Sequence, residues 1–258
     1  MEALKRVWLI FNLKTLGIAG LAALSTWLSF HYNVTADFPL TLITTAIVFP
    51  LVFSIGGAYK RREEALDQYG SIKAHGRAIY FAARDWLAEG NDPAKERVRD
   101  LMGQLLRECR TLFTGKLKDL PTNEKHVYAT FSELSSFIKT DLRGRGLASG
   151  EVSRCNQYLS KMILAFENVK HIFQYRTPRS LRAYSDVFIV VLPILYGPYF
   201  AHLALEFQQG LTYLMPVLFS VILVSLDNIQ MHLENPFDQI GDDDVLINAE
   251  KFVAGLEL

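Results

Sequence analysis

The chain has 258 residues, half of them hydrophobic, and its 27 basic and 27 acidic side chains leave no formal net charge. Four stretches contain no charged side chain and have lengths of 22, 22, 19 and 20 residues: 15–36, 38–59, 187–205 and 207–226. About 20 apolar residues in a helix cross a hydrocarbon core of about 30 Å, so each stretch predicts one membrane span. The sequence holds no glycine-rich phosphate loop and no Cys-His or Ser-His-Asp grouping, and we expect neither an enzyme nor a nucleic-acid partner.

Basic side chains are distributed unevenly along the chain. Three lie before residue 16, 23 lie in 60–186, and one, Lys251, follows the last span, whereas the connections at 32–37 and 206–210 contain none. The positive-inside rule therefore places both termini and the large middle region in the cytoplasm of a plasma or inner membrane. Region 60–186 has seven more basic than acidic residues and 227–258 has seven more acidic than basic, so we expect these two parts to attract each other.

The first span, Thr15 to Tyr32, is expected to remain in the protein. Its apolar stretch is too long for the core of a signal peptide, and no small-residue cleavage site follows it. Small side chains along its first half let another helix approach closely: Gly17, Ala19, Gly20, Ala22 and Ala23.

The second span, 38–59, runs without a break into a charged segment, which predicts a membrane helix that continues into the cytoplasm. Thr45, Phe49 and Phe53 recur every four residues and therefore share one face of that helix. Polar threonines in this span favour a helix that packs on neighbours or lines a path. Spacing alone also fits a stripe that faces lipid or fills a core.

Every element between the second and third spans has helical periodicity. Breaks at 89–93, 120–123 and 142–146 separate the expected helices, two of which should cover about 124–139 and about 150–173. Three prolines occur in the last two spans: Pro193, Pro198 and Pro216. In a membrane helix they mark either kinks beside a pore or simple packing adjustments.

The sequence thus predicts an all-α membrane protein with four transmembrane helices and a helical cytoplasmic domain. Its expected segments are spans one and two with the N-terminus, the cytoplasmic domain, spans three and four with a cytoplasmic extension, and an acidic tail: 1–59, 60–184, 185–235 and 236–258. The fourth helix should end at Asn235, because Pro236 disfavours helix in the residue before it. Cys109 and Cys155 lie far apart without other ligands at metal-binding spacing, so we expect both reduced and structural.

Three motifs lie in order along the chain. The first ends the second span: Phe53, Ala58, Tyr59, Arg61, Glu64 and Ala65. The second runs from Glu167 through Thr177-Pro178 to Tyr184, and the third is Asn235-Pro236-Phe237 followed by an acidic run. Together they resemble the signature motifs of the bestrophin family. The chain departs from the family pattern at Gly56-Gly57, at Arg62-Glu63, and in the longer spacing at Asp238-Gln239-Ile240. Its acidic run is also shorter than in the calcium-gated animal members of the family.

The resemblance implies a homopentameric ion channel whose second span lines a narrow neck and whose cytoplasmic helices form a vestibule. Thr45, Phe49 and Phe53 match the neck positions of the family. A ring of apolar side chains gates by excluding water, and therefore ions, until it widens. The basic cytoplasmic region favours chloride or other small anions, while some bacterial members of the family prefer cations. An alternative is a non-conducting scaffold in membrane lipid whose basic cytoplasmic helices bind a partner.

The resemblance also implies a calcium site near the tail. Its ligands would be Asp242, Asp243 and Asp244, with backbone carbonyls at positions matching Asn235 and His232. Calcium takes six to eight oxygen ligands, which carboxylates and carbonyls supply. The same acidic run also fits the start of a capped helix, where the helix dipole favours acidic side chains.

Overall fold

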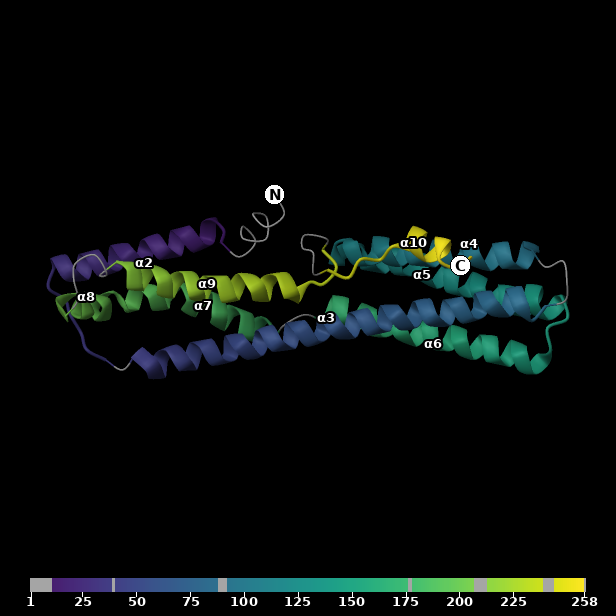
Figure 1. Ribbon diagram of the computed structural model, residues 1–258, viewed down its shortest axis with the longest axis horizontal. Helices are drawn as coiled ribbons and strands as arrows, with labels where there is room; N and C mark the ends of the chain where they lie inside the picture. Colours follow the sequence, from purple (N-terminus) through teal and green to yellow (C-terminus); the bar gives the residue numbers. More distant parts are fainter. Residues whose placement is uncertain are drawn as a thin grey trace. The chain divides into compact units, whose positions relative to one another are not determined.

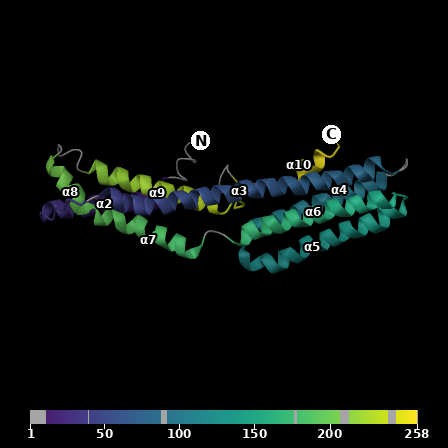
Figure 2. The same cartoon turned by 90° about the horizontal axis from the view of Figure 1, so that it is seen from below.

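A computed structural model describes residues 11–38, 40–87, 92–175, 178–206, 213–238 and 244–257. Within these ranges every regular element is helical and there is no strand. The chain forms two compact units, one from Met1–Lys60 with Thr177–Asn235 and the other from Arg61–Arg176 with Pro236–Leu258. Helix α3, Leu40–Asp85, is continuous and contributes its first part to one unit and the remainder to the other (Figures 1 and 2).

The first unit holds the apolar helices. Besides the start of α3 these are α2, α7, α8 and α9: Leu13–His31, Arg179–Leu195, Gly197–Glu206 and Leu214–Glu234. Among the described residues, four helical segments are long and apolar enough to cross a membrane: Leu13–His31, Ile43–Asp85, Ser180–Leu205 and Leu214–Glu234. The chain is therefore an integral membrane protein, and the predicted all-α fold with four spanning helices is confirmed.

Helix α2 packs along α9, α8 and α7 through one of its faces. Ala19 and Ala22 are buried in that face, at 6% and 0% exposure, which brings the helix backbones close together. Gly17 and Gly20 lie on the other side, where a Cβ atom would meet nothing within 4 Å. Only part of the predicted small-residue stripe is therefore used for packing within this unit.

The prolines of the last two spans have different local effects. A turn at Tyr196 separates α7 from α8, and Pro198 follows it as the second residue of α8. Pro216 lies in the first turn of α9, where no backbone N–H is needed. Helix α9 ends at Glu234 with Asn235 as its C-terminal cap, at the predicted position before Pro236.

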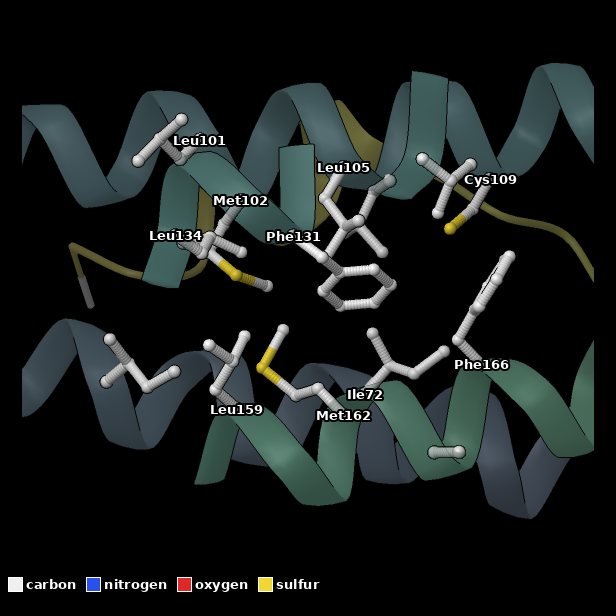
Figure 3. Packing of buried hydrophobic residues seen from close by; sticks show 14 of the residues in the cluster. Ile72, Leu101, Met102, Leu105, Cys109, Phe131, Leu134, Leu159, Met162 and Phe166 are labelled. Atoms are coloured by element: carbon white, nitrogen blue, oxygen red, sulfur yellow. The ribbon is translucent and has the colours of Figure 1, made fainter. Parts of the chain in front are cut away.

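The second unit is a helical bundle with one large core (Figure 3). It contains the rest of α3, α4, a 3₁₀ turn, α5, a π-helical turn, α6 and α10: Asp92–Thr114, Leu117–Asp119, Leu120–Phe137, Ile138–Leu142, Ser149–Gln174 and Ala249–Ala254. Helices α3 and α4 approach closely at Gly76, where a Cβ atom would lie only 2.1 Å from Cε of Met102. Burial raises the pKa of the Cys155 thiol to about 11 and also raises the pKa of Cys109. Both cysteines are free and buried, as expected for structural residues.

The C-terminal tail is part of this core. Phe237 is 1% exposed, and its ring stacks on that of Phe113 with centroids 5.0 Å apart. Among the described residues of the tail, five further side chains are buried: Val245, Ile247, Ala249, Phe252 and Leu256. Arg99 reaches Glu257 at 2.7 Å, so one of the basic helices forms an ion pair with the acidic tail. The Phe of the Asn-Pro-Phe motif therefore anchors the tail in the helical bundle.

Candidate functional site

The membrane part of α3 has two different faces. Ile47, Leu51 and Ala58 are 3%, 1% and 0% exposed, and Ile47 and Leu51 pack in clusters with residues of the other helices of the first unit. Phe49 and Phe53 are 60% and 67% exposed and lie on the opposite side of the helix. Since consecutive residues of a helix are about 100° apart, Phe49 and Leu51 necessarily face away from each other.

The two exposed aromatic rings form one apolar surface. Their centroids are 4.8 Å apart with planes at 79°, an edge-to-face contact between successive turns of the helix. Thr45, one turn before Phe49, is also exposed. Its hydroxyl donates to the carbonyl of Thr41 at 2.6 Å, which satisfies the donor within the same helix. The three residues singled out from the sequence thus form a continuous stripe of low polarity.

Pro50 lies in the same turn of the helix as this stripe, directly after Phe49. A proline inside a helix removes one backbone hydrogen bond and favours a bend. Sequence reasoning considered the prolines of the third and fourth spans and passed over this one. The signal in the sequence is a proline in the middle of a charge-free stretch, 38–59.

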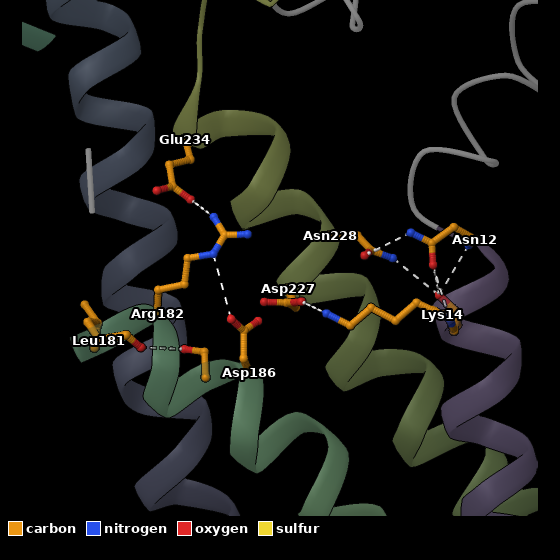
Figure 4. Close-up of polar contacts among 10 residues, drawn as sticks. Asn12, Lys14, Leu181, Arg182, Asp186, Asp227, Asn228 and Glu234 are labelled. Atoms are coloured by element: carbon orange, nitrogen blue, oxygen red, sulfur yellow. Dashed lines mark hydrogen bonds and ion pairs between the residues drawn. The ribbon is translucent and has the colours of Figure 1, made fainter. Parts of the chain in front are cut away.

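Charged and polar side chains tie the start of α2 to the end of α9 (Figure 4). Nζ of Lys14 lies 2.6 Å from Oδ2 of Asp227, whose side chain is only 4% exposed. Next to this pair, Asn12 donates to Oδ1 of Asn228 at 3.2 Å, and Asn228 donates to Thr15 at 3.3 Å. A buried carboxylate needs such a partner, because burial without one costs several kcal/mol.

A second ion pair lies between α7 and α9 (Figure 4). Arg182 donates to the carboxylate of Glu234, which is 7% exposed, and lies 3.9 Å from Oδ2 of Asp186. Sequence reasoning missed Asp227 and Glu234, although they are seven residues apart and so share one face of a helix. These pairs fix the ends of three spanning helices and make the scaffold against which α3 packs.

The predicted calcium ligands lie in different surroundings. His232 is in the last turn of α9 and Asn235 follows as its cap, with its side-chain Oδ1 buried and without a hydrogen-bond partner among the described residues. Asp244 is half-buried, whereas Asp242 and Asp243 lie outside the described residues. In the described part of the chain, no three His, Cys, Asp or Glu side chains gather as a metal site would require.

The alternative role of the acidic run as a helix cap is wrong. Helix α10 begins at Ala249, and Asn248 caps it by accepting the N–H of Lys251 at 2.8 Å. The residues before it, from Val245 onwards, are not helical. The first turn of α10 is therefore too far along the chain for Asp242–Asp244 to serve as its cap.

No family model and no curated protein matches the sequence. Solved structures do match it over nearly the whole chain. Two are crystal structures of point mutants of a bacterial bestrophin homologue from Klebsiella pneumoniae, both 17% identical. One has a TM-score of 0.71 and covers 95% of this chain and 98% of that chain. The other has a TM-score of 0.72 and covers 94% and 95%.

A third match is a crystal structure described as that of a membrane protein, also a point mutant, at 17% identity. Its TM-score is 0.75, and it covers 94% of this chain and 97% of that chain. At this level of identity the similarity establishes the fold. The resemblance indicated by the three motifs is thus confirmed as a shared fold that spans both units of the chain.

Proposed function

We propose that this chain is the subunit of a pentameric bestrophin-type ion channel, and that Thr45, Phe49 and Phe53 line the neck of its pore. The observation that supports this most is the fold shared with a bacterial bestrophin homologue over 95% of the chain. The stripe on α3 adds local support, because it points away from the helices of its own subunit.

The chemistry of the stripe accounts for gating. Five copies of α3 around an axis would bring five Phe49 and five Phe53 rings together. Apolar rings cannot replace the hydration shell of an ion, so a narrow ring dewets and blocks, and a wider ring conducts. The Thr45 hydroxyl is bonded to its own backbone and adds little polarity at the outer end of the stripe. The neck would therefore act as a gate and leave the sign of the ion to other regions.

Small anions, chloride above all, are the proposed ions. The excess of seven positive charges in 60–186 supports this choice, because a basic surface raises the local concentration of anions. The same distribution of basic residues supports a plasma or inner membrane location with both termini in the cytoplasm. A cation-conducting channel and a non-conducting scaffold that binds a partner through the basic helices are the competing functions.

Recording from the purified protein in a planar bilayer under a gradient of potassium chloride tests the proposal. Channel currents that reverse near the chloride equilibrium potential support an anion channel, whereas reversal near the potassium potential supports the cation channel. Phe49→Ala and Phe53→Ala should raise the current, since they lower the apolar bulk of the ring. Leu16→Ala is the matched control, because Leu16 is 73% exposed on α2 and lies outside the proposed pore. If the purified protein gives no current, the channel proposal fails and the scaffold function is favoured.

A further inference from the structure

Pro50 leaves a backbone acceptor open in the membrane part of α3. In a regular helix the carbonyl of Ala46 would accept the N–H of the residue four positions later, but that residue is Pro50 and has no N–H. A carbonyl without a donor is costly inside a membrane, where no water replaces the missing bond. The helix therefore needs a donor from elsewhere at this point.

Tyr184 of α7 supplies that donor. Its hydroxyl lies 3.1 Å from the carbonyl oxygen of Ala46 and donates a hydrogen bond to it. The Tyr184 ring packs against Phe188 one turn later, with centroids 4.6 Å apart, which fixes the direction of the hydroxyl. The hydrogen bond therefore joins two residues that are 138 positions apart in the sequence. Pro50 frees the carbonyl that accepts it, and the packed Tyr184 ring directs the hydroxyl that donates it.

The location of this bond matters because Ala46 and Pro50 enclose one turn of the proposed neck. Phe49 lies just before Pro50, and Thr45 lies just before Ala46. On the buried side of the same turn, Leu51 packs in a cluster with Ile189 of α7. Helix α7 thus holds α3 beside Pro50 by apolar packing and by the hydrogen bond of the Tyr184 hydroxyl to the open carbonyl. A change in the bend would move the Phe49 and Phe53 rings relative to the axis of the pore.

We propose that Tyr184 is a positioning residue for the channel gate: its hydrogen bond to the Ala46 carbonyl sets the bend of α3 at Pro50 and thereby the width of the phenylalanine ring. The inference rests on the proposed function of α3 as the neck. It assigns a role to the tyrosine that closes the second sequence motif, and it couples α7 to the gate.

A second proline in the same unit provides a natural control. Pro198 cannot donate to the carbonyl of Ile194, and Ser25 of α2 donates to that carbonyl at 2.7 Å. The chemistry is the same, a hydroxyl bonded to a carbonyl four residues before a proline. Neither partner belongs to α3, so loss of this bond should leave the gate unchanged.

The experiment is a double-mutant cycle on single-channel currents. Tyr184→Phe removes only the hydroxyl, and Pro50→Ala returns an N–H to the helix, which then satisfies Ala46 without Tyr184. We expect Tyr184→Phe to change the ratio of open to closed times by about five-fold, the size that loss of one hydrogen bond produces. In the Pro50→Ala background the same substitution should change nothing further. Ser25→Ala should match the parent, and all variants should assemble with the same mass.

The outcomes separate the inference from the proposed function. If Phe49→Ala alters the currents but Tyr184→Phe does not, the proposed neck is supported and the proposed role of Tyr184 is refuted. Equal effects of Tyr184→Phe with and without Pro50 also refute it, because they show that the hydroxyl acts elsewhere. If neither the parent nor Phe49→Ala conducts, the proposed function itself fails. Should Pro50→Ala not assemble, the comparison of Tyr184→Phe with Ser25→Ala still decides between a specific and a general effect.

Discussion

Replacing Lys14 by Met should destabilise the membrane unit, because it removes the ion-pair partner of the buried Asp227 carboxylate. The two groups lie 2.6 Å apart, and their side chains are 34% and 4% exposed. At an effective dielectric constant of about 20, this separation corresponds to a Coulomb attraction of about 6 kcal/mol. The hydration that Asp227 loses on burial offsets part of it, and breaking buried pairs costs about 3–5 kcal/mol. Since Lys14 is partly exposed, we expect about 3 kcal/mol.

Titration of the purified protein with denaturant in detergent measures this change in the free energy of unfolding. The matched control is Arg97→Met, which breaks the ion pair between Arg97 and Glu133. These groups lie 3.3 Å apart, and their side chains are 57% and 45% exposed, respectively. Exposed pairs contribute less than about 1 kcal/mol, so this control should be nearly neutral. Adding Asp227→Asn to Lys14→Met should recover part of the loss, because it removes the unpaired charge. Equal stability of Lys14→Met and Arg97→Met would refute the reasoning.

Three further outcomes are expected. Native mass measurement in detergent should give a homopentamer, and a monomer or dimer would contradict the pore proposal. Phe237→Ala should destabilise the second unit by about 3–5 kcal/mol, because it empties a buried site against Phe113, whereas trimming Leu246, which is 61% exposed, should cost little. Micromolar calcium should increase the current of the parent but not of a variant with Asn at positions 242–244; currents that ignore both changes would exclude a calcium site there.

Local patterns in the sequence determined most of the helical framework. The four charge-free stretches predicted the four spans, because the length of an apolar helix must match the thickness of a membrane whatever else the chain does. Pro236 predicted the end of α9 at Asn235, since a proline acts on the residue directly before it. The spacing of Thr45, Phe49 and Phe53 predicted that they share a face, as the structure has them.

Tertiary structure decided which faces are used and which residues meet. The sequence allowed the stripe on α3 to face a core, and only the packing of Leu51 on the other side of the helix leaves Phe49 and Phe53 exposed. The start of α10 also differs from the capped helix that the acidic run suggested, because Asn248 provides the cap. A helix cap depends on a single hydrogen bond, and Asp and Asn side chains are both able to make it. The sequence therefore does not tell which of several neighbouring polar residues is the cap.

Long-range polar contacts gave no signal in the sequence. Lys14 and Asp227 are 213 positions apart, and Tyr184 and Ala46 are 138 apart, so neither pair belongs to one local pattern. Each exists because the membrane removes water as an alternative partner and the fold brings a donor to an acceptor that would otherwise remain open. Periodicity reports where a side chain points on its own helix, whereas the identity of its partner depends on how the helices pack.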